Sequence, residues 1–253
     1  MTVLRVPAAS AEAPEVTRQL APTGRLRAAI NTGNSVLAGR DAAGELVGIS
    51  VDLAREIARR LALPLDLVPF DAAGKVTASA GADTWDVAFL AIDPDRAREI
   101  AFSPPYVVIE GSYLVPAASP FRAVGDLDRD GVRIAVGRGS AYDMFLARSL
   151  SRATRVPAET SQGAIDLFVA QRLDAAAGVR QPLMAYARAH PDTRVIPGRF
   201  TAIEQAVGVP QGRPEAAAHL REIVEELKAA GFVAAALARH GQTDADVAPP
   251  ASR

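Results

Sequence analysis

Hydrophobic and polar positions alternate along the chain in blocks that predict strands separated by helices. Short apolar runs indicate strands, and apolar residues repeating at spacings of three and four indicate helices. In the first part of the chain the predicted strands cover 26–30, 65–70 and 86–91, and the predicted helices cover 51–61 and 75–80. Strands that alternate with helices in this way are typical of a parallel α/β sheet with right-handed crossovers.

The second part of the chain repeats this alternation after a long apolar segment. The predicted strands cover 107–116, 132–136, 155–159, 174–178, 194–196 and 204–209, and the predicted helices cover 140–150, 164–170, 181–189, 215–227 and 232–240. Just before the long segment, Ser103–Tyr106 contains two prolines and predicts an extended corner. We therefore expect a second α/β lobe, residues 116–203, inserted into a first lobe made of residues 25–115 and 204–241.

Both ends of the chain are rich in alanine, proline and polar residues, and we expect residues 1–24 and 242–253 to be disordered. Residues 1–24 contain no apolar run of about 7–15 residues, so they do not resemble a signal peptide. No apolar run in the chain approaches the ~20 residues that a membrane-spanning helix needs.

Composition removes several classes of function. The chain has 28 basic and 29 acidic residues, and this balance argues against a nucleic-acid-binding protein. Without cysteine, disulfides and thiolate chemistry are excluded, and the three histidines lie at or near the ends or surfaces of predicted helices. We therefore expect no transition-metal site and no bound cofactor. The common hydrolase, metalloprotease and phosphate-loop motifs are also absent from the sequence.

One candidate binding residue follows a predicted buried strand. Arg96 comes just after the carboxyl end of strand 86–91, where ligands bind in open α/β sheets. An arginine presents a planar set of donors that matches a carboxylate in a bidentate arrangement. The alternative is a surface ion pair between Arg96 and Asp93, Asp95 or Glu99.

Two further segments join a strand to a helix. Gly137–Tyr142 places glycines before a helix start, where free backbone N–H groups bind anions. The alternative is an ordinary turn in which Ser140 caps the helix, and both can hold together. In the segment Gly178–Pro182, Arg180 either faces a cleft between the two lobes, together with Arg96, or is exposed to solvent.

Taken in order, several loose motifs resemble the family-3 periplasmic solute-binding proteins, the polar amino-acid receptors of ABC transporters. The resemblance covers about residues 24–241. The motifs are GELVGISVDL at 44–53, WDVA at 85–88, Arg96 six residues before Phe102, FSPPY at 102–106, Gly137–Tyr142 and LDAA at 173–176. The resemblance implies the type II periplasmic-binding-protein fold, with two α/β lobes joined by two crossing strands and a ligand cleft that closes by hinge motion. It also implies a monomer in the periplasm with an ABC transporter permease as its partner. The N-terminal segment, which does not resemble a signal peptide, leaves the cytoplasm as the alternative location.

The resemblance assigns roles to particular residues. Arg96 matches the arginine that binds the α-carboxylate of the ligand, and the backbone N–H groups of Ser140 and Ala141 assist from the other lobe. Gly139 and Tyr142 belong to the same motif.

The chain also departs from the family pattern. Ala91 replaces a hydroxyl residue, Asn34 replaces an aromatic residue, and a second aromatic residue is missing near Gly74, so that Phe89 or Phe70 would have to substitute. No carboxylate stands near Val179 or Arg180, where the family binds the α-ammonium group. An unpaired ammonium group beside an arginine would be costly to bury.

These departures suggest an oxygen-rich ligand that is not a standard α-amino acid, such as a keto, hydroxy or dicarboxylic acid. Asn31, Asn34, Arg96 and Arg180 are candidate contacts, and Lys75 would add positive charge. Alternatively, Glu110 supplies the missing acceptor, which would restore an amino acid as the ligand.

An enzyme on the same fold is the main competing hypothesis. Cyclohexadienyl dehydratases, which act on prephenate or arogenate, need a general acid over the substrate. Glu110 and Glu204 are the candidates in this sequence, and neither has a visible partner. A ligand-sensing domain of a larger receptor is a third possibility.

Overall fold

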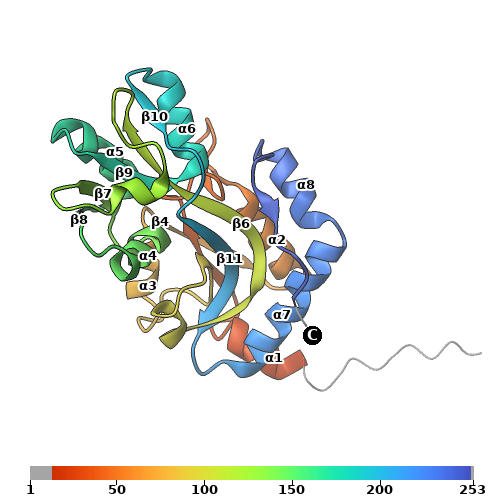
Figure 1. Ribbon diagram of the computed structural model, residues 1–253. Helices are drawn as coiled ribbons and strands as arrows, with labels where there is room; N and C mark the ends of the chain where they lie inside the picture. Colours follow the sequence, from red (N-terminus) through yellow and green to blue (C-terminus); the bar gives the residue numbers. More distant parts are fainter. Residues whose placement is uncertain (1–12, 252–253) are drawn as a thin grey trace, which may run out of the picture.

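The computed structural model describes residues 13–251, which form two α/β lobes around a sheet that continues from one lobe into the other (Figure 1). Its main strand order is β4-β1-β5-β11-β6-β9-β7-β8. In the first lobe, β4 (Leu65–Phe70), β1 (Leu26–Asn31) and β5 (Val87–Ala91) are parallel. In the second lobe, β9 (Ala175–Val179), β7 (Arg133–Gly137) and β8 (Thr154–Ala158) are parallel. The alternation of strands and helices in the sequence therefore predicts the fold class correctly.

Helices cover the strands of each lobe. The first lobe contains α1 (Ala13–Leu20), α2 (Ile49–Arg60), α3 (Ala73–Ala78), α7 (Pro214–Ala229) and α8 (Phe232–Arg239), with a small hairpin of β2 (Gly39–Arg40) and β3 (Leu46–Val47). The second lobe contains α4 (Ala141–Ser149), α5 (Ser161–Ala170), α6 (Arg180–Ala189), the 3-10 turn η2 (Val124–Leu127) and the edge strand β10 (Thr193–Val195). In residues 13–251, no helix combines the length and apolar character needed to cross a membrane.

Two long strands run side by side from the first lobe into the second. β6 (Ile100–Pro116) and β11 (Thr201–Pro210) are antiparallel, and both are visible through the middle of Figure 1. The predicted corner at Ser103–Tyr106 is wrong, because β6 continues through both prolines. The hydroxyl of Ser103 accepts a hydrogen bond from the backbone N–H of Val207 at 3.1 Å, and the β11 register shifts on either side of Ala206. The irregular pairing accommodates prolines that have no N–H to donate.

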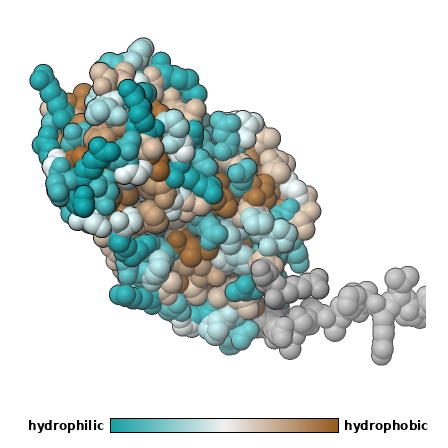
Figure 2. Space-filling model, in the orientation of Figure 1, coloured by the Kyte–Doolittle hydropathy of each residue, from teal (hydrophilic) through white to brown (hydrophobic). Residues whose placement is uncertain are grey.

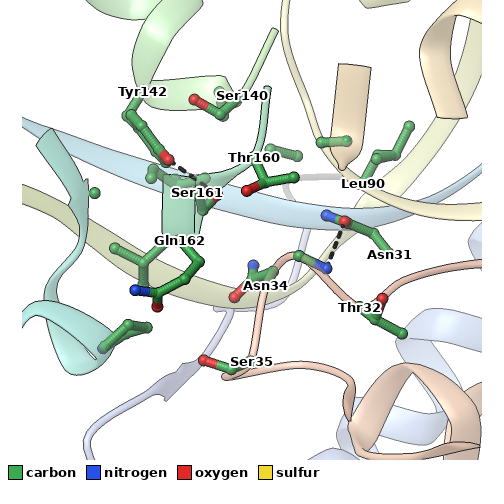
Figure 3. A pocket seen from close by; sticks show the side chains of 18 of the residues that line it. Asn31, Thr32, Asn34, Ser35, Leu90, Ser140, Tyr142, Thr160, Ser161 and Gln162 are labelled. Carbon is green, nitrogen blue, oxygen red and sulfur yellow. Dashed lines mark hydrogen bonds between the residues drawn. The ribbon is translucent and has the colours of Figure 1, made fainter. Parts of the chain in front are cut away.

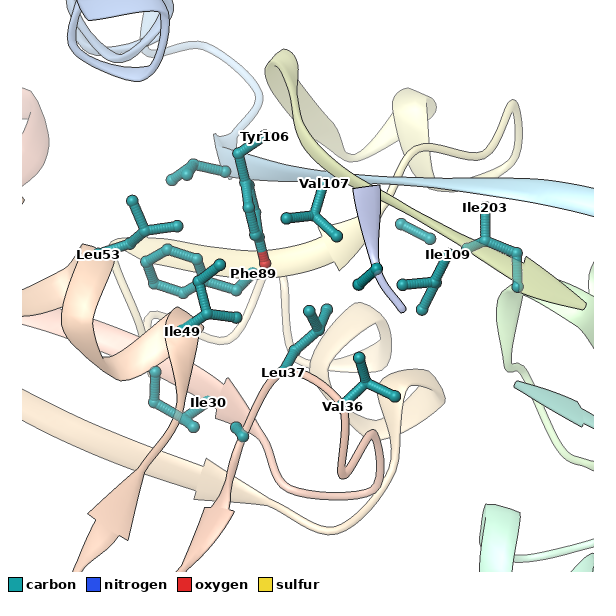
Figure 4. Packing of buried hydrophobic residues seen from close by; sticks show 14 of the residues in the cluster. Ile30, Val36, Leu37, Ile49, Leu53, Phe89, Tyr106, Val107, Ile109 and Ile203 are labelled. Atoms are coloured by element: carbon teal, nitrogen blue, oxygen red, sulfur yellow. The ribbon is translucent and has the colours of Figure 1, made fainter. Parts of the chain in front are cut away.

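The core of the first lobe packs between its sheet and α2. Phe89 and Tyr106 contact each other edge to face, with ring centroids 6.3 Å apart, and aliphatic side chains surround them (Figure 4). On the surface, hydrophilic and hydrophobic residues are interspersed over the face that Figure 2 shows. Within the part of the chain that the structure describes, Val169 is the only large hydrophobic side chain that is exposed.

The prediction of disordered ends is wrong for the described residues at both ends. α1 buries Leu20, and the backbone carbonyl of Gln19 accepts a hydrogen bond from Arg213 at 2.9 Å. Near the other end, β12 (Asp246–Val247) pairs with β6, and Ala245 and Ala248 are buried. These segments are ordered through contacts with α7 and β6. Residues 1–12 and 252–253 lie outside the described part.

Candidate functional site

A cavity of about 430 Å³ lies between the two lobes. Figure 3 shows Asn31, Thr32, Asn34 and Ser35 of the first lobe facing Ser140, Tyr142, Thr160, Ser161 and Gln162 of the second. Each group follows the carboxyl end of a parallel strand, β1 in the first lobe and β7 or β8 in the second. These strand ends are where ligands bind in open α/β sheets.

Arg96 is the most buried charged group of the cavity, with 1% of its surface exposed. It begins the 3-10 turn η1 (Arg96–Arg98), five residues after the end of β5. Its Nη1 donates to the carbonyl of Ala91 at 2.9 Å, and its Nη2 donates to the carbonyl of Gly139 at 2.9 Å. Because Gly139 belongs to the second lobe, this guanidinium joins the two lobes.

The guanidinium of Arg96 has no salt-bridge partner among the described residues and has unused hydrogen-bond donors. Burial lowers the pKa of its guanidinium to about 10, an effect that the charge of Asp93 partly offsets. Its Nε is sealed from solvent without a hydrogen-bond partner, and no carboxylate of the described chain forms a salt bridge with it. A guanidinium has five N–H donors, and only two are used here. The guanidinium is therefore a buried cation with unused donors, and an anion bound to it would offset the free-energy cost of its desolvation.

The second lobe presents the starts of two helices to the cavity. Ser140 caps α4 by accepting from the backbone N–H of Asp143 at 3.1 Å, and Thr160 caps α5 by accepting from Gly163 at 3.0 Å. The first N–H groups of a helix have no intrahelical acceptor, so those at Ala141 remain available to an anion. Both interpretations of this turn, helix cap and anion site, are compatible with its geometry.

Tyr142 connects these two helix starts. Its hydroxyl donates to the Ser161 hydroxyl at 2.9 Å, and burial raises the pKa of its phenol. A Cβ at position 137 would lie 2.8 Å from this hydroxyl, so the close approach requires Gly137. The pair fixes the wall of the cavity on the side of the second lobe.

The first lobe contributes two asparagines at the end of β1. The side-chain oxygen of Asn31 accepts from the backbone N–H of Gly33 at 3.1 Å, and that of Asn34 accepts from Val36 at 3.3 Å. These bonds hold the loop and leave both amide nitrogens without a described partner. The Asn31 contact is drawn in Figure 3.

Contacts between the lobes border the cavity. A Cβ added at Gly74 would lie 3.1 Å from the carbonyl of Arg138, and one added at Gly139 would lie 3.0 Å from the Cα of Gly74. Arg148 on α4 forms an ion pair of 2.6 Å with Asp93, which is 4% exposed. The missing aromatic residue near Gly74 therefore leaves room for direct backbone contact between the lobes.

The structure brings together most of the site predicted from the sequence. The predicted residues that line the cavity are Asn31, Asn34, Ala91, Arg96, Ser140, Ala141 and Tyr142, and Gly139 contacts Arg96 through its carbonyl. Arg96 does not form the surface ion pair that was the alternative.

Besides Gly139, four predicted contacts lie outside the cavity lining, namely Phe89, Lys75, Arg180 and Glu110, and the structure places each of these four elsewhere. Phe89 packs in the first-lobe core, as Figure 4 shows, because its side chain points away from the cavity. Lys75 bonds to Asp71 at 2.8 Å. Arg180 donates to the carbonyl of Gly198 at 2.9 Å and lies 3.8 Å from Glu110, which also pairs with Arg199.

Several lining residues were not predicted. They include Asp71, Thr160, Ser161, Gln162 and Gln205. The start of α5 after strand β8 was a usable signal, since it repeats the arrangement of β7 and α4. Asp71 is half exposed, and its hydrogen bond with Lys75 holds the pKa of its carboxyl below the ordinary value. Within residues 13–251, no group of three or more acidic or histidine residues is arranged to hold a metal ion.

Comparison with known proteins gives a consistent family. Residues 26–243 match the family model of bacterial extracellular solute-binding proteins, family 3. Among solved structures, an ArgBP mutant from T. maritima has a TM-score of 0.77 and 23% identity, covering 89% of this chain and 99% of that chain. The ancestral amino acid-binding protein AncCDT-1, a precursor of cyclohexadienyl dehydratase, has a TM-score of 0.73 and 22% identity, covering 87% and 97%. A solute receptor for L-cysteine of Neisseria gonorrhoeae has a TM-score of 0.77 and 20% identity, covering 89% and 92%.

Proposed function

Because this chain belongs to the bacterial extracellular solute-binding proteins of family 3, we propose that it binds a small carboxylate between its lobes and closes around it. The observation that carries the proposal is Arg96, a buried cation with unused donors and no anionic partner among the described residues. A charge-assisted hydrogen bond contributes about 1.5–3 kcal/mol. Two such bonds would supply much of the ~8 kcal/mol that a micromolar affinity requires.

The second lobe supports the same anion from the opposite side. The free N–H groups at the start of α4 face the cavity at Ser140 and Ala141. We propose that closure moves residues 116–203 relative to residues 25–115 and 204–241 by bending β6 and β11. Because residues of both lobes would contact the solute, solute binding would favour the closed cleft, and closure would strengthen solute binding.

The family supports a wider role in transport. We propose that the protein delivers its solute to the permease of an ABC transporter and that it acts in the periplasm. We also propose that it binds solute as a monomer, with the two lobes of one chain enclosing the ligand.

A dehydratase activity has little support from the cavity. Neither Glu110 nor Glu204 lines it, and the acidic residue that does, Asp71, has a lowered pKa. A general acid must hold a proton near neutral pH, which requires a raised pKa. The resemblance to AncCDT-1 is to a protein described as amino acid-binding, and it shows the fold alone.

A thermal-shift screen tests the proposal. Protein that has been unfolded and refolded, to release any retained solute, is heated with amino acids, keto acids, hydroxy acids, dicarboxylates and prephenate. A solute at 100 times its Kd stabilises the fold by ~2.7 kcal/mol, which corresponds to several degrees in Tm.

Arg96→Ala should remove the stabilisation, and Arg98→Ala is the matched control because Arg98 is exposed and pairs only with Asp95. A solute that stabilises wild type and Arg96→Ala equally would contradict the proposal. Conversion of prephenate by the wild type would favour the enzyme instead.

A further inference from the structure

Gln205 lines the same cavity as Arg96. It lies on the crossing strand β11, is 5% exposed and lines the cavity. Its direct antiparallel partner is Ala91 on β5. Side chains of such partners point to the same face, with Cβ atoms about 4.5–5.5 Å apart. Arg96 donates to the carbonyl of the same Ala91, so Gln205 and Arg96 are both neighbours of Ala91 and both line the cavity.

The amide of Gln205 has no partner in the described part of the chain. It forms no side-chain hydrogen bond there, and neither of its polar atoms is sealed from the cavity. The other lining amides each make one hydrogen bond: the side-chain oxygens of Asn31 and Asn34 accept backbone N–H groups, and the amide nitrogen of Gln162 donates to Asp166 at 3.0 Å. A buried amide is costly when unpaired, so a ligand group that pairs with it gains affinity.

The charge around this position selects among ligand groups. Arg96 is a cation, and the acidic residue of the lining, Asp71, is half exposed and paired with Lys75. An α-ammonium group beside Gln205 would lie near the guanidinium without a buried carboxylate. A hydroxyl or carbonyl oxygen carries no such penalty, since it accepts from the amide nitrogen, and a hydroxyl also donates to the amide oxygen.

We propose that Gln205 is a specificity-determining residue that binds the oxygen at carbon 2 of a 2-hydroxy or 2-keto carboxylate. The inference rests on the proposed function, because it places the carboxylate of that ligand on Arg96. It adds a contact from the crossing strand β11. The binding site then comprises both lobes and the hinge strand that joins them.

Two matched series of acids test this assignment by isothermal titration calorimetry. The first is 2-hydroxyglutarate, 2-oxoglutarate, glutamate and glutarate, and the second is lactate, pyruvate, alanine and propionate. Within a series the members differ at carbon 2. For whichever series binds, an oxygenated member should bind the wild type about 2- to 12-fold more tightly than the unsubstituted acid, as one hydrogen bond between neutral groups allows.

Substitutions separate the role of the amide from that of the fold. Gln205→Leu and the longer Gln205→Met should abolish the preference, so that the ratio of the two affinities, oxygenated member over unsubstituted acid, falls to about one. Gln205→Glu should shift the preference toward the amino member, because it supplies the missing carboxylate. Urea unfolding of each variant establishes that it is folded.

Each contrary result has a distinct meaning. An equal loss for all four members in both Gln205→Leu and Gln205→Met would make Gln205 a structural residue and overturn the inference. Tightest binding of glutamate or alanine by the wild type would also overturn it, while the proposed function stands. If no carboxylate in a wider screen binds through Arg96, the proposed function fails and the inference fails with it.

Discussion

Two buried charged groups in this molecule, Asp86 and Arg96, have opposite electrostatic surroundings. In the first lobe, Arg27 pairs with Asp86 at 2.9 Å, and Arg213 pairs with the same carboxylate at 3.1 Å. Asp86 is fully buried, and its hydrogen bond raises the pKa of Arg27. At the cavity, Arg96 is equally removed from solvent, yet its pKa is lowered to about 10.

The difference separates a structural charge from a functional one. The charges around Asp86 are matched within the fold, so the folded protein has already gained their attraction. Arg96 bears a desolvation cost that Asp93 offsets only in part, and the remaining compensation is left for a ligand. A lowered arginine pKa in a cavity is therefore more informative about binding than the presence of an arginine alone.

The largest expected effect comes from breaking the matched site. Asp86→Asn leaves Arg27 and Arg213 without their carboxylate and should lower the free energy of unfolding by about 3–5 kcal/mol. Urea denaturation measures this. Asp66→Asn is the control, because Asp66 forms an exposed pair with Arg25 and should cost about 1 kcal/mol or less. Equal losses in the two variants would mean that the buried ion pairs of Asp86 stabilise the fold no more than the exposed pair of Asp66.

A smaller effect on stability, with a large effect on binding, is expected at the unmatched site. Arg96→Met keeps the apolar volume and removes the buried charge, so the free energy of unfolding should stay constant or rise by about 1–3 kcal/mol. Carboxylate affinity should fall by at least about 150-fold, from the loss of two charge-assisted hydrogen bonds. Calorimetric binding and urea denaturation give the two values. Destabilisation as severe as that of Asp86→Asn would assign Arg96 a structural role.

The smallest effect is a change of carboxylate affinity with pH, which follows the charge of Arg96. A bound anion requires the charged guanidinium, so affinity should stay level from pH 7 to 9 and fall above about pH 10. Stability has the opposite sign. Because the folded-state pKa lies below its ordinary value, the cost of the buried cation is present below pH 10 and lessens above it. Titration calorimetry at increasing pH tests the binding, and affinity unchanged well above pH 10 would contradict it.

How far the sequence predicts this molecule depends on whether a feature is local. Arg96 and Ser140 follow strands within a few residues, so periodicity and helix-start chemistry predict their positions, and both line the cavity. Arg180 was expected in the cavity, but Glu110 and the carbonyl of Gly198 hold it elsewhere. Gln205 was not predicted to line the cavity, because its position there depends on pairing with Ala91, a residue more than a hundred positions away in the sequence.

The same reasoning explains the ends of the chain. The composition of α1 and of the segment around β12 gives little propensity for order, and both are held by packing on distant elements. Leu20 is buried in the core cluster that includes residues of α7, and Val247 pairs with Val107 on β6. Sequence patterns report the contacts that a segment makes with itself, and they miss order acquired from elsewhere in the fold.

The bonds that join the lobes also affect how fast a solute can enter and leave. The contact of Arg96 with Gly139 and the pair of Arg148 with Asp93 belong to the protein alone, so part of the closing free energy exists without solute. Entry then depends on the fraction of time the lobes are apart, and association is slower than free diffusion allows. A solute that adds bonds across the cleft prolongs its own stay, whereas one that adds none leaves at the next opening.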